Sequence, residues 1–474
     1  MLALEPGAPQ LFVDDHLIER SRGLRRTLHR PVKDGGGLEP VIALGDEYGD
    51  LGATLEANGT IVWDPRLERW VMFALALASA RRGPDRARLY RFTSRDGIAW
   101  TKGADGRPEQ IVFDLTDPRT GASATGIDLF ACHYDASEER HPYRGWLYNW
   151  GGPLEGVYFV HSADGRTWER GRRVVAAESR WLVQDGRVLH GPGDVTIFSP
   201  DPSRGRHLAL LKFFSPRPVE HRSRLRSRAF MWVEHLDDAI DLDRLERVDL
   251  VPPAAEVDGD RPHDEYYAST AWRYGEMWLG GLKIWHRDGD HPHSAAGCAF
   301  LKLASSRDGL CWEKVPFAGE DGVPEVWIPN GEEGGGGGRA DGGYLTEFSQ
   351  GPLRIGDELV HYYGCSSLGK NHPAATRLTG GGIYRARLRL DGFVSVDAGT
   401  IETPALTLPG GGLRVNAVGP VTVELVGAAG ETLGTSRVDG DSVRHAVRLP
   451  APEGAARLRF AVEPGGRLYS FTAG

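Results

Sequence analysis

Short runs of alternating hydrophobic and polar residues follow one another along most of the chain. Residues 89–93, 382–388 and 456–462 are typical, with apolar side chains at every second position. This period of two indicates half-buried β-strands, and Gly, Pro and Asp separate the runs as turn residues do. The pattern therefore predicts an all-β protein.

A seven-residue motif, Ser-x-Asp-Gly-x-x-Trp, occurs three times, at residues 94–100, 162–168 and 306–312. Each copy follows a strand-like run, and Asp-Gly favours a tight turn because glycine adopts positive φ without strain. The Trp would begin the returning strand as a large apolar plug. The motif is thus interpreted as a hairpin element, not a catalytic one, and its spacing predicts a degenerate fourth copy near residue 234.

The motif belongs to a larger repeat, which the sequence shows five times. Inner strands are expected to begin near residues 54, 127, 194, 266 and 345, and each is followed by further strands and a turn. Five such four-stranded units predict a five-bladed β-propeller over residues 1–400, with the strand around Phe12 closing the ring. Residues 401–474 contain shorter alternating strands and are predicted to form a small β-sandwich.

Composition limits the class of partner. The formal net charge of −9 and the pI near 6.0 argue against nucleic acid and anionic membranes, so a neutral polar small molecule or oligosaccharide is expected. The N-terminus lacks the features of a signal peptide and no long apolar segment is present, which predicts a soluble, cytoplasmic protein. The oligomeric state is left open.

Acidic residues recur at equivalent points of the repeat, where inner strands start near the propeller axis. They are Glu56, Asp128, Asp194, Asp264, Glu265 and Glu347. A carboxylate in an apolar strand must be hydrogen-bonded, paired or functional. Acids sharing one axis shift each other's pKa, so that one can stay protonated while another is ionised, as glycosidic bond cleavage requires. A purely structural role, on strand N–H groups or a central water or cation, is the alternative.

Histidine and aromatic residues add to this picture. His190 and His263 stand close to the inner acids and could bind sugar hydroxyls or, with those acids, a divalent metal. Because no compact ligand motif is present, no metal ligand is assigned and no cofactor is expected to be required, although a divalent metal stays possible. Trp150, Tyr267 and Trp285 lie near strand ends, where a ring could stack on a sugar.

Together, the five repeats, Leu11-Phe12-Val13-Asp14-Asp15 and the C-terminal strands resemble bacterial relatives of the five-bladed glycoside hydrolases, the clans of invertases, levanases and arabinanases. The invertase-type Asn-Asp-Pro-Asn-Gly, Arg-Asp-Pro and Glu-Cys motifs are absent. The resemblance implies a glycosidase of carbohydrate metabolism, with Glu265 as proton donor, Asp128 and Asp194 as base or nucleophile and pKa-tuning partner, and the other acids in reserve.

Two other functions stay open on the sequence alone. The protein could be a non-catalytic carbohydrate-binding propeller, or a propeller that carries out a lyase, isomerase or metal-assisted biosynthetic reaction, because one fold hosts many reactions. The sugar, the linkage and the stereochemical outcome are also undetermined.

Overall fold

The structure of the chain is a computed structural model. The structure describes residues 1–43, 55–56, 60–77, 87–103, 106–114, 116, 126–177, 179–182, 188–215, 225–245, 247–249, 264–287, 296–319, 326–370, 372, 381–410, 412–452 and 454–474. These residues are almost entirely in strands and turns, with single helical turns at η1 (Asp34–Gly37), η4 (Leu242–Arg244) and α2 (Gly335–Gly338).

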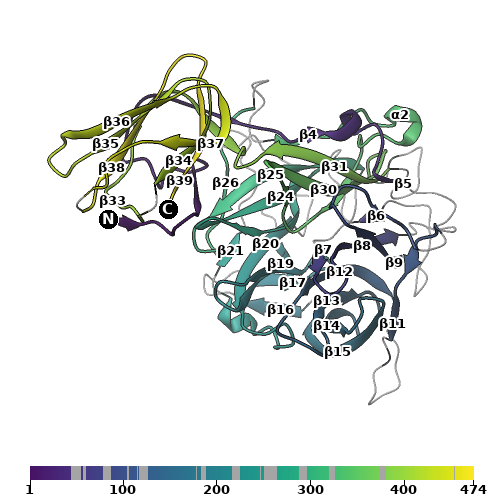
Figure 1. Cartoon of the computed structure of the whole chain (residues 1–474). Coiled ribbons are helices and arrows are strands. Elements are labelled where there is room, and N and C mark those ends of the chain that lie inside the picture. Colours follow the sequence, from purple (N-terminus) through teal and green to yellow (C-terminus); the bar gives the residue numbers. More distant parts are fainter. Residues whose placement is uncertain are drawn as a thin grey trace.

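Five predominantly antiparallel sheets are arranged around one centre, so the predicted five-bladed β-propeller is confirmed (Figure 1). Blade one contains β6 (Leu55–Glu56), β7 (Ile61–Asp64), β8 (Arg69–Leu77), β9 (Ala87–Ser94) and β10 (Glu109–Gln110). Blade two contains β11 (Val112–Asp114), β12 (Ile127–Tyr134), β13 (Tyr143–Asn149), β14 (Gly156–Ser162) and β15 (Thr167–Ala176). Blade three contains β16 (Ser179–Leu182), β17 (Val188–Gly191), β18 (Ile197–Asp201), β19 (Arg206–Ser215), β20 (Leu225–Val233) and β21 (Arg247–Asp249). Blade four contains β22 (Glu265–Ser269), β23 (Trp272–Tyr274), β24 (Met277–Arg287), β25 (Gly297–Ser306), β26 (Glu313–Lys314) and β27 (Val326–Ile328).

Blade five is completed by the N-terminal part of the chain, which closes the ring. Its own strands are β28 (Leu345–Phe348), β29 (Leu353–Ile355), β30 (Glu358–Cys365) and β31 (Gly382–Arg389), and β4 (Val32–Lys33) and β5 (Ile42–Ala43) pair with β31. Lys33 Nζ lies 2.5 Å from Asp341 Oδ2, and both side chains are largely buried. Asp34 binds Arg385 and Arg387 of β31. These ion pairs therefore stabilise β4, the two-residue strand that closes the ring.

The prediction that the strand around Phe12 closes the ring is wrong. β2 (Pro9–Leu11) pairs with β39 (Arg467–Ala473), and β3 (Arg20–Leu28) pairs with β32 (Val394–Glu402). Phe12 is fully buried, with its ring centroid 6.1 Å from those of Phe460 and Phe471. The large apolar side chain of Phe12 thus belongs to a second core at the C-terminal end of the chain.

That second core is enclosed by a nine-stranded sheet, seen in yellow and purple in Figure 1. Besides β2, β3, β32 and β39, the sheet contains β34 (Leu413–Val418), β35 (Val421–Val426), β36 (Thr432–Val438), β37 (Asp441–Val447) and β38 (Arg457–Val462). Next to it, β1 (Leu2–Ala3) pairs in parallel with β33 (Leu406–Thr407). Strand pairing therefore joins β2, β3 and β32 to the strands of residues 413–473 in one sheet.

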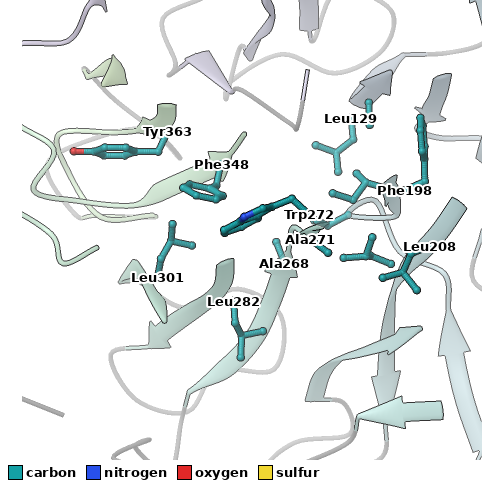
Figure 2. Packing of buried hydrophobic residues seen from close by; sticks show 14 of the residues in the cluster. Leu129, Phe198, Leu208, Ala268, Ala271, Trp272, Leu282, Leu301, Phe348 and Tyr363 are labelled. Carbon is teal, nitrogen blue, oxygen red and sulfur yellow. The ribbon is translucent and has the colours of Figure 1, made fainter. Parts of the chain in front are cut away.

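The main hydrophobic core runs between neighbouring blades (Figure 2). Trp272 lies beside Phe348 of blade five, with a centroid distance of 5.9 Å. The hydroxyl of Ser199 in blade three donates to the Ala271 carbonyl at 2.6 Å. These contacts join blades three, four and five to one another.

The Ser-x-Asp-Gly-x-x-Trp motif forms a hydrogen-bonded turn, as predicted. In the first copy, Asp96 Oδ1 accepts bonds from the N–H groups of Ile98 and Ala99, each at 2.8 Å, and the Gly97 N–H donates to Ser94 Oγ at 2.9 Å. Gly97 has φ of 73°, in the left-handed region that favours glycine. The copies at Asp164 and Asp308 make the same bonds.

The tryptophan of each motif packs on the blade that precedes it, in addition to its own hairpin. Trp168 of blade two lies 5.7 Å from Phe73 of blade one, and Trp312 of blade four lies 5.6 Å from Phe230 of blade three. Trp100 of blade one lies 5.6 Å from Tyr362 of blade five. The motif therefore joins blades around the ring.

Blades three and five each have a turn at the equivalent position that lacks the full motif. Other residues at these turns contact the preceding blade. In blade three, the Leu236 carbonyl accepts a 2.7 Å hydrogen bond from Trp146 Nε1 of blade two. In blade five, Phe393 lies 5.1 Å from Tyr274 of blade four. The turn predicted near residue 234 is thus present, although it lacks the motif's glycine and tryptophan.

The motif carboxylates should make stability depend on pH in acid. Hydrogen bonds from the N–H groups of Ala99 and Ile98 lower the pKa of Asp96 from 3.8 to about 2. A folded-state pKa below the unfolded value gives stability that is present above the unfolded pKa and is lost as pH falls through the folded one. We expect the melting temperature of Asp96→Asn to lie below that of the parent at pH 6, and the difference to vanish near pH 2.

Thermal unfolding at a series of pH values tests this expectation. Glu139→Gln, a change at an exposed residue of blade two, serves as the control and should match the parent throughout. A deficit in Asp96→Asn that stayed constant from pH 6 to pH 2 would show that the carboxylate charge has no part in holding the turn.

Candidate functional site

Glu265 stands at the start of β22 and is ion-paired inside the protein. Its Oε2 accepts a 2.7 Å hydrogen bond from Arg226 on β20, and the carboxylate is 1% exposed. Burial is the largest single effect and lowers the pKa of Arg226, but the charge and hydrogen bond of Glu265, together with Tyr267 and Tyr344, raise it by more in sum, so the net pKa is raised. A guanidinium in this position stabilises the ionised carboxylate. The contact therefore fits Glu265 as a base or nucleophile better than as a proton donor.

Asp264, the preceding residue, has a different partner. Its Oδ1 lies 2.5 Å from Nδ1 of His286, near the end of β24. Asp264 is buried, whereas the His286 side chain is 18% exposed. A carboxylate on one ring nitrogen fixes the orientation of an imidazole. The sequence predicts Asp264 only as an alternative to the three main catalytic acids, and it predicts no catalytic role for His286.

Asp194 lies between β17 and β18 and forms an ion pair with Lys212 of β19. The lysine is buried, while the Asp194 side chain is 25% exposed. Glycine is needed beside this pair, because a Cβ at Gly193 would lie only 2.3 Å from Lys212 Cε. The Gly-Pro-Gly-Asp sequence therefore leaves a passage for the lysine to reach the carboxylate.

Cationic side chains converge on the ring of Tyr267, which is itself almost completely buried. Nζ of Lys212, Lys283 and Lys370 lies 4.9, 4.7 and 4.7 Å from the ring centroid, and Arg226 Cζ lies 4.8 Å from it. Lys370 Nζ also donates a 3.0 Å hydrogen bond to the Tyr267 hydroxyl. We call these five residues the Tyr267 cluster; it joins blades three and four to the segment after β30.

The lysines of the Tyr267 cluster were missed by sequence reasoning. A signal was present for two of them: Lys212 interrupts the apolar run 208–214, and Lys283 interrupts 282–285. A charged residue inside a buried strand has the same significance as the acids that were counted. Lys370 lies in a polar segment, and its sequence context carries no such signal.

Two aromatic side chains proposed for sugar stacking belong to this buried region. Trp285 has no exposed surface and packs against Arg226 and Lys370, at 4.9 and 4.8 Å from its ring centroid. Tyr267 is surrounded as described above. Trp150 follows β13 of blade two and is half-buried, with its backbone N–H donating to the Gly126 carbonyl at 2.9 Å.

The remaining predicted residues are placed as follows. Asp128 is buried on the inner strand β12 and does not take part in the contacts given above for the Tyr267 cluster. His190 lies on β17, opposite Phe214. Glu56 and Glu347 are on the inner strands β6 and β28, as expected, but their side chains fall outside the described residues. His263 lies wholly outside them.

No helix among the described residues is long and apolar enough to cross a membrane. No protein-family model matches the chain, and no curated protein matches it either.

Solved structures do show similarity. A protein described as a glycoside hydrolase matches with a TM-score of 0.45 and 12% identity, over 76% of this chain and 92% of that one. A fructofuranosidase from Schwanniomyces occidentalis complexed with fructosylnystose matches with a TM-score of 0.40 and 9% identity, over 94% and 98%. Zg3597, a family 117 glycoside hydrolase from Zobellia galactanivorans, matches with a TM-score of 0.39 and 8% identity, over 76% and 89%. The expected resemblance to glycoside hydrolases thus recurs among solved structures, while the activity has to be argued from the site.

Proposed function

We propose that the protein cleaves a glycosidic bond at the site formed by the Tyr267 cluster and its acidic partners. The observation that carries the proposal is that consecutive acids have different partners: Asp264 is paired with a histidine, which can transfer a proton, and Glu265 with an arginine, which cannot. Cleavage needs one group that gives a proton to the leaving oxygen and one carboxylate that acts as base or nucleophile. The Asp264–His286 pair suits the first role and Glu265 the second.

These roles modify the assignment implied by the resemblance. Glu265 changes from proton donor to ionised carboxylate, because Arg226 stabilises its charge. Asp194 stays a candidate base, since a quarter of its side chain is exposed to solvent. Asp128, on the inner strand β12, also stays a candidate catalytic acid.

The Tyr267 cluster supports an acidic sugar as the substrate class. Lysine and arginine side chains bind carboxylate and other oxyanions through charge-assisted hydrogen bonds. Four such groups lie within 4.9 Å of one ring centroid, and two of them, Lys212 and Arg226, are paired with Asp194 and Glu265. A uronate, whose carboxylate would be held by these groups, therefore fits better than the neutral saccharide expected from the net charge of the whole chain.

The hydrogen bond from Lys370 to the Tyr267 hydroxyl favours a second candidate, elimination from a uronate. In that reaction a base removes the proton at C5, a double bond forms between C4 and C5, the C4–O bond breaks, and the leaving oxygen takes up a proton. Tyrosine beside lysine can serve as such a base. Products distinguish the candidates, because only elimination gives an unsaturated uronate that absorbs ultraviolet light.

A substrate screen tests the proposal. We expect turnover of 4-nitrophenyl glucuronides or galacturonides, or of uronate oligosaccharides, and much less of the matching glucosides and galactosides.

Lys370→Met should raise KM for the acidic substrate by about 10-fold, the loss expected for one charge-assisted contact, and leave KM for a neutral glycoside unchanged. Lys314→Met, on the outer strand β26, is the control. Equal turnover of acidic and neutral glycosides would reject the acidic-substrate proposal.

A further inference from the structure

A pair of residues flanks every complete copy of the hairpin motif, one before its Ser and one after its Trp. Because the motif fixes the register, these residues face each other across the two strands. The pairs are Thr93 with Thr101, His161 with Glu169, and Ser305 with Glu313. In blade one the Thr93 and Thr101 hydroxyls lie 3.0 Å apart. Of these three pairs, only the pair in blade two places a histidine opposite a carboxylate.

A second histidine stands next to the pair in blade two. His141 precedes β13, and its ring centroid lies 4.4 Å from that of His161. One ligand atom from each of His141, His161 and Glu169 lies within 4.8 Å of the other two. The three come from separate segments, which the motif and the β12–β13 connection bring together on the outer part of the blade.

The chemistry of this set is that of a divalent metal site. Two imidazoles and one carboxylate are ligands that Zn²⁺ prefers, at about 2.0–2.2 Å, with water in the fourth position. Ligand atoms as much as 4.8 Å apart would have to approach one another by up to about 1.5 Å to reach the separation of roughly 3.4 Å between ligands of one tetrahedral ion. Glu169 is exposed and has the freedom for this movement. The neighbouring Arg144 is bound by Glu138 at 3.0 Å, which partly offsets its charge.

The geometry points to a zinc site formed by His141, His161 and Glu169. The bound ion would join the β14–β15 hairpin of blade two to the β12–β13 connection. The site is separate from the Tyr267 cluster and does not depend on the proposed reaction. Among the described residues, it is the group of three or more His, Cys, Asp or Glu side chains whose ligand atoms come this close. Bound zinc would link three segments of blade two and stabilise them against unfolding.

Metal titration of the full chain tests the site. After treatment with a chelator, the protein should bind one equivalent of Zn²⁺ in competition with a chromophoric chelator, and Co²⁺ should give the visible absorption of a tetrahedral site. Removing a ligand should cost more than the roughly 10- to 100-fold that loss of an outer-sphere partner costs. His141→Ala is therefore expected to lower the affinity for Zn²⁺ by at least about 100-fold.

The repeat supplies a matched variant that keeps the hairpin intact. The double change His161→Thr and Glu169→Thr installs the threonine pair of blade one, and should abolish both the Co²⁺ spectrum and the rise in melting temperature with Zn²⁺. His235→Ala, an exposed histidine of blade three, should behave as the parent does. Absence of stoichiometric binding to the parent, or full binding by the threonine variant, would overturn the inference.

Discussion

Replacing Glu265 by glutamine is expected to lower kcat/KM for the acidic glycoside by about 10²- to 10⁴-fold, the range for loss of a positioned acid or base. Glutamine keeps the shape of the side chain but has no negative charge. It removes the negative charge that lies 2.7 Å from the Arg226 guanidinium. Steady-state kinetics on parent and variant measure the loss, with product binding as the check that the site is still formed.

The matched control for this variant is Glu313→Gln, at an exposed carboxylate on β26 of the same blade. It should leave kcat/KM unchanged. A Glu265→Gln enzyme with the kinetics of the parent would contradict the role given to this carboxylate.

His286→Gln separates the two catalytic roles. If the Asp264–His286 pair supplies the proton, the variant should lose most activity on substrates with poor leaving groups and much less on 4-nitrophenyl glycosides, whose leaving group needs little protonation. Equal losses on both would indicate that the pair only shapes the site.

The blades were predictable from sequence because their signals are local. Period-two alternation identifies strands, and the three motif copies mark equivalent turns, so the ring follows from counting repeats. Ring closure is different, because strand pairing between distant segments depends on surroundings that no local pattern records. β4 has only two residues, Val32 and Lys33, and is held by the buried contact of Lys33 with Asp341. The apolar run Leu11-Phe12-Val13 was the better local candidate, but the strand that leads into it pairs with β39, and Phe12 packs in the second core.

The site was predicted in part for a related reason. Glu265 and Asp194 were found because a charge in an apolar context is conspicuous within one strand. Their partners, Arg226 and Lys212, come from the adjacent strands β20 and β19, so each ion pair exists only in three dimensions. Roles that depend on the partner, such as proton donor or ionised carboxylate, could therefore not be assigned from position in the repeat.

Trp168→Ala is expected to lower the free energy of unfolding by about 3–5 kcal/mol, the range for removing a large aromatic side chain from a core. Trp168 is fully buried, and its ring lies 4.9 Å from Phe130 of its own blade and 5.7 Å from Phe73 of blade one. The substitution would open a cavity at the junction of the two blades. Denaturant unfolding followed by circular dichroism measures the change.

Two further variants identify the cause of that loss. Trp168→Phe should cost less than half as much as Trp168→Ala, because it keeps most of the ring and because Trp168 Nε1 donates no hydrogen bond to a described residue. Trp100→Ala should also cost less, since the side chain of Trp100 is only half-buried beside Tyr362. If Trp168→Ala cost less than about 1 kcal/mol, below the range for core truncations, the motif would be a local turn that does not join one blade to the next.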